Sequence, residues 1–214
     1  MDLTERLERC YTGVLNDVMR GMGLRNFVLP PEIRPLFPER PLAGPVWTVS
    51  GHVDEAADRH TTLFEWTGLL AKARPGHVIV CQPHTHAVAL MGELSAETLK
   101  NKGVLGCYID GLARDVDFLL KMKFQTWCSG FTPRDIVGYW LPKGFDTPIR
   151  IGDVVVEPGD YMVADRDGAV RIPKGIVADV VAKAEEAVAT ENKVRSAILA
   201  GLDPQEAYLK YGKF

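Results

Sequence analysis

The amino-acid sequence predicts a mixed α/β fold, and three observations support this prediction. Two apolar runs, at residues 77–81 and 104–109, have the composition of buried strands, and a helix is expected between them. Short strands alternate with Gly- or Asp-containing turns over residues 149–172, and helices are expected near both ends of the chain. Strand runs that are apolar throughout and joined by one helix are typical of a parallel pair.

The N-terminal third begins with a helix and continues as extended chain. Apolar residues recur at helical spacing over residues 2–22, and Gly21 and Gly23 are expected to end this helix. Six prolines follow between residues 30 and 45, so this stretch cannot be helical. A strand is predicted at residues 46–53.

Helices and strands alternate through the rest of the chain. Helices are predicted over residues 59–72, before Pro75-Gly76, over residues 94–102, with Gly103 as the C-terminal cap, and from about Arg114 to Met122. A long charged helix is predicted over about residues 176–199. Four short strands precede it, and the last two are expected to form a hairpin; the strands are residues 149–151, 154–156, 161–164 and 169–172.

Composition limits the class of protein. The 214 residues are 46% hydrophobic with a formal net charge of −3, which is typical of one globular domain over residues 1–214 and gives no electrostatic attraction to nucleic acid or an anionic membrane. The four cysteines form no Cys-x-x-Cys pair, so free thiols in a reducing compartment are expected. No apolar run approaches the ~18 residues of a membrane span. A soluble, cytoplasmic protein is therefore expected.

Two strand-to-helix junctions are the candidate functional segments, because ligands of open α/β sheets collect at the carboxyl ends of strands. At the first, Gly92 lets the backbone approach a ligand closely, and the amides of Glu93, Leu94 and Ser95 open a helix and form an anion site. At the second, Arg114 can bind a carboxylate or polarise a carbonyl oxygen, and Asp115 offers a hard oxygen ligand for a magnesium-type ion. Together they describe a site for a 2-oxo acid. The alternative is that both junctions are solvated helix starts.

Other polar segments have a structural and a functional interpretation. His84 and His86 lie on one face if their segment is extended, which would allow metal binding, but a structural pair is favoured. The polar residues from His52 to His60 are interpreted as a solvated loop and helix start, with a pocket wall as the alternative. The four tryptophans are expected to pack in cores or subunit contacts, and the C-terminal helix is either a solvated face or a docking face.

The sequence resembles the RraA-like family, which includes class II 4-hydroxy-4-methyl-2-oxoglutarate/4-carboxy-4-hydroxy-2-oxoadipate aldolases. The resemblance covers nearly the whole chain, and its most specific part is the Ile-Asp-Gly-x-x-Arg-Asp segment placed after a Gly-Glu-Leu turn. The segments that carry it are Ile33-Arg34-Pro35-Leu36, Gly44-Pro45-Val46-Trp47-Thr48-Val49, Met91-Gly92-Glu93-Leu94-Ser95-Ala96, Lys102-Gly103-Val104, Ile109-Asp110-Gly111-Leu112-Ala113-Arg114-Asp115, Thr132-Pro133-Arg134-Asp135, Pro158-Gly159-Asp160 and Asp165-Arg166-Asp167-Gly168.

The resemblance implies a compact domain of the swivelling β/β/α type with N- and C-terminal helices, assembled as a homotrimer or homohexamer with sites between subunits. It implies that Asp115 holds Mg²⁺ or Mn²⁺, mostly through water, and that Arg114 binds a 2-oxo acid near its keto oxygen. Backbone amides around Gly92 to Ser95 would hold the substrate carboxylate, and Glu93 would orient a metal-bound water. Ser95 replaces an apolar residue that is common there, which implies altered substrate contacts.

The family also draws an acidic residue from the C-terminal region of a neighbouring subunit, and Glu186 and Glu191 are the candidates. The implied activity is retro-aldol cleavage of a 4-hydroxy-2-oxo acid through a pyruvate enolate, with oxaloacetate decarboxylation as a side activity. Two alternatives remain: a non-enzymatic protein that regulates ribonuclease E by binding, and a decarboxylase or hydratase acting on another 2-oxo acid.

Overall fold

A mixed sheet of eight strands forms the centre of the molecule in the computed structural model, which describes residues 1–213. The strand order is β1-β7-β5-β3-β2-β12-β13, and β9 pairs with the second half of β2. Neighbours among β2, β3, β5 and β7 are parallel, and the other pairs are antiparallel. The strands are β1 (Arg34–Pro35), β2 (Leu42–Val53), β3 (Val78–Gln82), β5 (Gly106–Ile109), β7 (Gln125–Cys128), β9 (Trp140–Phe145), β12 (Tyr161–Ala164) and β13 (Ala169–Ile172).

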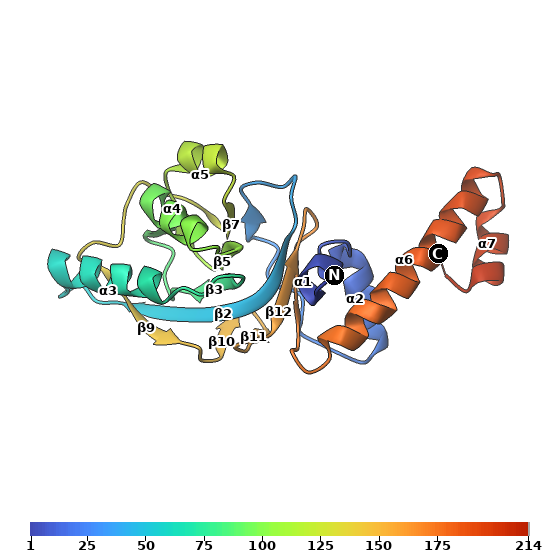
Figure 1. The fold of residues 1–214 in the computed structure, drawn as a ribbon, viewed down its shortest axis with the longest axis horizontal. Coiled ribbons are helices and arrows are strands. Elements are labelled where there is room, and N and C mark those ends of the chain that lie inside the picture. Colours follow the sequence, from blue (N-terminus) through green and yellow to red (C-terminus); the bar gives the residue numbers. More distant parts are fainter. Residues whose placement is uncertain (214) are drawn as a thin grey trace.

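Two smaller sheets accompany the central one. Three short strands, β4 (Ala89–Met91), β6 (Leu112–Ala113) and β8 (Gly130–Phe131), pair in parallel in that order. A two-residue turn joins β10 (Ile149–Ile151) to β11 (Val154–Val156) in an antiparallel hairpin. Figure 1 shows this hairpin and β9 on one side of the long strand β2.

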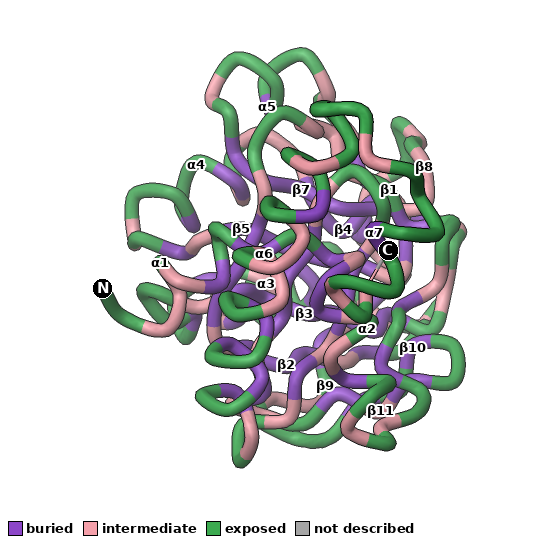
Figure 2. Tube along the Cα trace, turned by 90° about the vertical axis from the view of Figure 1, so that its right-hand side faces the viewer, coloured by how far each residue is buried: buried purple, intermediate pink, exposed green. Residues whose placement is uncertain are grey.

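Helices α3 (Arg59–Lys72), α4 (Glu93–Asn101) and α5 (Val116–Met122) lie on the opposite side of the central sheet from that hairpin (Figure 1). Their apolar faces pack on the sheet in a cluster that contains Leu69, Leu99 and Leu119, and a second cluster fills the space between the sheet and the β10–β11 hairpin. In Figure 2 the buried positions follow β2, β3, β5 and β7, and the helices are buried on one side only. The sheet, apolar on both faces, is therefore covered on both faces, as parallel strands require.

The terminal helices form a separate layer against β12 and β13. A third apolar cluster joins α1 (Leu3–Leu7), α2 (Thr12–Gly21) and the first half of α6 (Val177–Leu199) to these strands. The second half of α6 and α7 (Pro204–Tyr211) extend away from the body of the molecule (Figure 1). Among residues 1–213, no helix combines the length and the apolar character of a membrane span.

The expected mixed α/β class is confirmed, and several boundaries need correction. Residues 2–22 form two helices, because the carboxylate of Asp165 accepts hydrogen bonds from the N–H and the hydroxyl of Thr12, both at 2.7 Å, and so starts a new helix there. The helix that was expected to begin at about Arg114 is α5, and it begins at Val116. The parallel pair β3–β5 is present, but β4 lies between its strands in the sequence together with the expected helix.

Candidate functional site

The three short parallel strands bring the candidate residues together. Strand β4 ends at Met91 before Gly92, β6 ends at Ala113 before Arg114, and β8 leads into a loop that contains Asp135. The N–H of Arg114 donates to the carbonyl of Met91 at 2.8 Å, which fixes the second junction beside the first. Because parallel strands end at the same edge of a sheet, segments far apart in the sequence share one site.

Gly92 is in contact with both functional side chains of the second junction. A Cβ atom at this position would lie 2.6 Å from Asp115 Oδ2 and 3.2 Å from Arg114 Nε. Its backbone is extended (φ −146°), so glycine is needed for space and not for conformation. Within the chain, glycine at this position leaves room for Arg114 and Asp115, and its close approach to a ligand stays a prediction.

Asp115 holds its carboxylate against the N-terminus of α4. Its backbone is left-handed (φ 56°), a conformation that Asp tolerates better than most residues, and it is the N-cap residue of α5, although its side chain makes no capping hydrogen bond to that helix. Asp115 Oδ2 accepts the N–H of Glu93 at 3.0 Å, and the side chain is 36% exposed. The N–H groups of Leu94 and Ser95, two residues that line the cleft, have no acceptor within residues 1–213, so two amides at the N-terminus of α4 are unpaired there.

Arg114 lies between two carboxylates. Its Nε is 3.5 Å from Asp115 Oδ2 and its Nη1 is 3.5 Å from Asp135 Oδ2, with 37% of the side chain exposed. Asp135 belongs to a quoted family segment but was not predicted as a site residue. The available signal was its place in the segment Thr132-Pro133-Arg134-Asp135, which carries part of the family resemblance, because the strand before it, β8, is not predicted from the sequence.

These residues line a cleft of about 420 Å³. Its polar part carries Arg114 with Glu93, Asp115 and Asp135, and α3 supplies an apolar wall that includes Leu63, Trp66 and Leu70. Trp66 Nε1 donates to the hydroxyl of Ser95 at 3.0 Å. The sequence predicted Trp66 only as a packing residue, since nothing local shows that α3 turns this side chain toward α4.

The donor set at Asp115 fits a magnesium-type ion. Of its two carboxylate oxygens, Oδ2 takes the Glu93 amide and Oδ1 has no hydrogen-bond partner within the described chain. A hard cation that keeps several waters needs only one or two carboxylates. No group of three or more His, Cys, Asp or Glu side chains suited to holding a metal occurs among residues 1–213, so any ion here depends on water or a neighbouring chain for further ligands.

The other sequence candidates lie apart from the cleft lining. His84 has a left-handed backbone (φ 58°), so the extended geometry that would place His84 and His86 on one face is absent, and His86 Nε2 lies 3.3 Å from Asp110 Oδ1. In the segment from His52 to His60, Asp58 caps α3 by accepting the N–H of Thr61 at 2.7 Å, a bond that lowers the pKa of Asp58.

The two candidate C-terminal acids have different surroundings. Glu191 lies in a groove between α2 and α6, where Lys213 Nζ is 2.6 Å from its Oε1 and the Tyr11 hydroxyl donates to its Oε2. Glu186 is exposed near the middle of α6. Neither residue lines the cleft of its own chain.

Comparison with known proteins places the chain in a family. Residues 12–171 match the family described as RraA-like (Aldolase/RraA). A Halalkalibacterium halodurans protein named "Putative 4-hydroxy-4-methyl-2-oxoglutarate aldolase" is 29% identical over 98% of this chain and 95% of its own length. Protein DlpA of Legionella pneumophila is 23% identical over 98% of this chain, but the chain spans only 34% of the length of that relative.

A solved structure adds to this comparison. RraAS2 of Streptomyces coelicolor, described as an unusual member of the RNase ES inhibitor RraA protein family, superposes with a TM-score of 0.79 at 27% identity, covering 90% of this chain and 95% of its own. The sequence match spans both junctions of the cleft, and the fold match spans most of the chain. The protein belongs to the RraA-like family.

Proposed function

We propose that the protein is a divalent-metal-dependent lyase that cleaves a 4-hydroxy-2-oxo acid into pyruvate and a carbonyl compound. The observation that supports this most is the meeting of Arg114, the Asp115 carboxylate and two unpaired helix-terminal amides in one cleft. This set offers separate partners for a carboxylate, a keto oxygen and a cation. The name of the Halalkalibacterium relative supports aldolase chemistry.

The chain's own groups bind and orient the substrate. The N–H groups of Leu94 and Ser95 donate to the carboxylate at C1, where the helix dipole also favours negative charge. The guanidinium of Arg114 donates to the keto oxygen at C2, on which charge develops during the reaction. Asp135 and Asp115 hold that guanidinium from two sides, which reduces its freedom.

Carbon–carbon cleavage then follows from removal of the proton on the 4-hydroxyl. The C3–C4 bond breaks, its electron pair forms the enolate of pyruvate, and C4 leaves as an aldehyde or ketone. Glu93 orients a water that carries the proton, and the enolate is finally protonated at C3. Asp115 would hold an Mg²⁺ or Mn²⁺ ion, which would supply positive charge to stabilise an enolate. Oxaloacetate gives the same enolate on losing carbon dioxide, so its decarboxylation is an expected side activity.

The test is pyruvate release from oxaloacetate and from 4-hydroxy-2-oxo diacids, measured with and without Mg²⁺. Arg114→Ala removes a charge contact made mainly in the transition state, so kcat is expected to fall by a factor on the order of 10² to 10³. Arg134→Ala is the matched control, because the Arg134 guanidinium stacks 4.3 Å above the ring of Tyr139 and does not line the cleft. Equal turnover in the two variants contradicts the role of Arg114.

Metal dependence is tested separately through Asp115. A chelator is expected to abolish pyruvate release, and added Mg²⁺ or Mn²⁺ is expected to restore it. Asp115→Asn keeps the shape of the side chain but removes its charge, so it should weaken the metal response of an otherwise folded protein. Full activity in the presence of the chelator would remove the metal from the proposal.

We further propose that the protein works as a homotrimer or homohexamer in which a neighbouring subunit completes the cleft. Leu94, on the cleft lining, is 76% exposed, so a neighbouring chain docked beside the cleft would bury apolar surface there. Glu186 is the better candidate for the incoming acid, because Glu191 is engaged by Lys213 and Tyr11. The mass in solution and the activity of Glu186→Gln test this assembly.

A second candidate function is the regulation of a ribonuclease by binding. The similarity to RraAS2 over 90% of this chain favours it. This alternative predicts stable binding to a ribonuclease E-type enzyme and no metal-dependent release of pyruvate. The pyruvate assay therefore separates it from the lyase.

A further inference from the structure

We propose that the cleft selects 2-oxo acids whose distal end is uncharged and apolar, with an alkyl or aryl group in place of a second carboxylate. This inference rests on the lyase function proposed above and names the substrate class of the same site. It follows from the way charged and apolar side chains are divided over the cleft walls.

The charged side chains of the cleft are concentrated around Arg114. The lining contains one cation, Arg114, and three carboxylates, those of Glu93, Asp115 and Asp135. In the proposed binding mode, the substrate carboxylate next to the keto carbon lies nearest to the helix-terminal amides. A second substrate carboxylate would therefore have to be bound elsewhere in the cleft by groups of this chain that are not yet engaged, because the residue proposed above to enter from the neighbouring subunit, Glu186, is itself an acid.

The wall formed by α3 offers no charge for such a carboxylate. All of its lining residues are uncharged: Leu63, Trp66, Thr67 and Leu70. The opposite loop adds two further aliphatic side chains, Ile136 and Val137. A carboxylate placed here would lose water without gaining a partner, which is unfavourable, whereas an alkyl or aryl group gains from the same burial.

The polar atoms on these walls are already hydrogen-bonded within the chain. The indole N–H of Trp66 donates to Ser95, and the hydroxyl of Thr67 donates to the carbonyl of Leu63 at 2.9 Å. The hydroxyl of Thr98 donates to the carbonyl of Leu94 at 2.7 Å. Within the lining of described residues, the proton of the Ser95 hydroxyl is the side-chain donor left besides Arg114. One neutral donor compensates poorly for removing a carboxylate from water.

Nearby cations are engaged away from the cleft. The guanidinium of Arg134 lies over Tyr139, and the ammonium of Lys100 donates to the carbonyl of Met122 at 2.6 Å. The ammonium of Lys102 donates to the carbonyl of Ala71 at 2.5 Å. None of these three cations lines the cleft.

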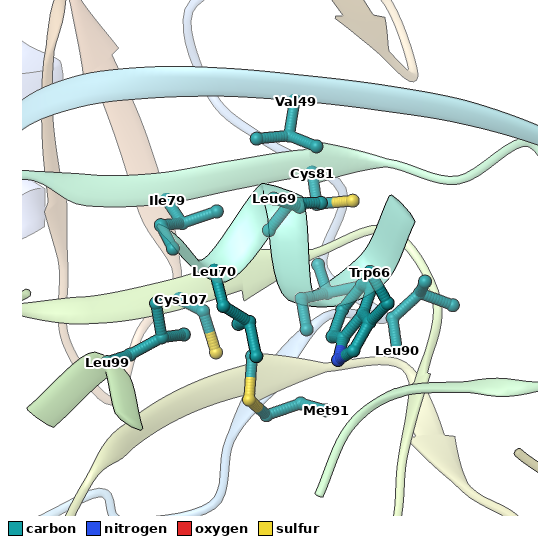
Figure 3. A pocket seen from close by; sticks show the side chains of 11 residues that line it. Val49, Trp66, Leu69, Leu70, Ile79, Cys81, Leu90, Met91, Leu99 and Cys107 are labelled. Atoms are coloured by element: carbon teal, nitrogen blue, oxygen red, sulfur yellow. The ribbon is translucent and has the colours of Figure 1, made fainter. Parts of the chain in front are cut away.

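The apolar wall is also backed by apolar space. Trp66, Leu70, Leu90 and Met91 line both the cleft and a small cavity of about 10 Å³. The side chains that line this cavity are apolar or thiol side chains (Figure 3). A cavity near the lower limit for one water, about 10–15 Å³, and without polar partners stays dry. The wall can therefore adjust to a bulky apolar group without exposing a buried polar atom.

The experiment compares two substrates of nearly equal shape. One is 4-hydroxy-2-oxoglutarate, with a distal carboxylate, and the other is 4-hydroxy-5-methyl-2-oxohexanoate, in which an isopropyl group replaces that carboxylate. Pyruvate release from each is measured with Mg²⁺ present. The isopropyl substrate is expected to have a kcat/KM higher by about tenfold or more, the factor to which 1.4 kcal/mol corresponds.

Charge variants of α3 test the wall itself. Leu63→Arg places a cation at the apolar wall and is expected to shift the ratio of the two kcat/KM values by about tenfold toward the dicarboxylate, an effect of the size of one charge-assisted contact. Thr67→Arg provides a second, independent cation on the same helix face. Phe64→Arg is the matched control, because Phe64 is the exposed neighbour of Leu63 and does not line the cleft.

The outcomes separate this inference from the lyase proposal. A wild-type preference for the distal carboxylate, or an unchanged ratio in both Leu63→Arg and Thr67→Arg, overturns the apolar selection while the lyase function stands. Release of pyruvate from neither substrate, nor from oxaloacetate, overturns the lyase function and this inference with it. Thermal denaturation of each variant checks that the fold is retained.

Discussion

Gly92 is the residue whose replacement tests the geometry of the cleft most directly. Because Gly92 has no side chain, Asp115 Oδ2 and Arg114 Nε can lie close to the position that a Cβ atom would take. Gly92→Ala is therefore expected to lower the free energy of unfolding by about 1–3 kcal/mol, the usual cost of overpacking, and to disturb the bond between Asp115 and the Glu93 amide. Urea denaturation measures the first effect, and pyruvate release measures the second.

Gly68→Ala is the control for that prediction. Gly68 lies inside α3, and a Cβ atom there would meet nothing within 4 Å. Because glycine weakens helix interiors, this change should raise the free energy of unfolding by about 0.5–1 kcal/mol. If Gly92→Ala is as stable as the wild type, the contact between Gly92 and the two site side chains is not a constraint.

At the residue scale, the sequence predicts the parts of the site that are local in the chain. Arg114, Asp115 and Glu93 stand in short segments at strand ends, and their chemistry can be read from neighbouring positions. Asp135 and Trp66 reach the same cleft from β8 and α3, and their roles depend on the pairing of β6 with β8 and on the packing of α3 beside α4. Contacts of this kind are set by tertiary structure, which residue spacing does not encode.

The start of α2 is an element held in place by a distant side chain. Asp165, in the turn between β12 and β13, accepts from both the N–H and the hydroxyl of Thr12. Asp165→Ala should lower the free energy of unfolding by about 1–2 kcal/mol, in the range of a lost helix cap. Asp167→Ala is the control, because Asp167 is exposed in the same turn. Equal chemical denaturation curves for the two variants would contradict the capping role.

The pairing of α1 with α6 should depend on pH. Arg6 donates to both carboxylate oxygens of Glu185, at 2.8 and 2.7 Å, and this hydrogen bonding lowers the pKa of Glu185 from its ordinary value of 4.5. Since the folded state holds the charged form, the pair stabilises the fold above that ordinary value, and the stabilisation is lost as the pH falls through the lowered pKa.

Glu185→Gln therefore should lower the melting temperature at neutral pH and have a diminishing effect as the solution is acidified. The measurement is the melting temperature of wild type and variant from neutral pH to below the ordinary pKa of Glu185. A difference that stays constant from neutral to strongly acidic pH would show that the charge of Glu185 is not its cause.

At the element scale, turn residues predict the bounds of secondary-structure elements better than helical periodicity does. The four strands between residues 149 and 172 are present with the expected bounds, because Gly and Asp turns separate them. The break between α1 and α2 was missed, since the apolar spacing continues across it and the cause is the carboxylate of Asp165. Strands β4, β6, β7, β8 and β9 and helix α7 were also missed; β9, for example, pairs with β2, a partner distant in sequence.

At the scale of the whole molecule, all four thiols lie inside the fold. The cysteines are free and buried, and burial raises the pKa of Cys107 to about 12 and that of Cys128 to about 11. Because the thiolate is the reactive form, we expect no reaction with a disulfide reagent at neutral pH until the protein unfolds, when all four thiols react. Rapid labelling of the native protein would contradict this.

The same raised pKa values contribute to a loss of stability at alkaline pH. The unfolded thiols ionise above their ordinary value of 9.0, whereas the folded ones retain their protons. The stabilisation is therefore complete below that value and declines as the pH rises toward the folded pKa values. Melting temperatures on the alkaline side measure this decline.

The position of Trp66 should make ligand binding in the cleft measurable by tryptophan fluorescence. Trp47, Trp127 and Trp140 are at most 2% exposed, while Trp66 is partly exposed and stands in the cleft wall. A collisional quencher such as acrylamide should reduce chiefly the fluorescence of this one indole. A 2-oxo acid that fills the cleft should shield it, so that the emission measured during a titration follows binding without any attached dye.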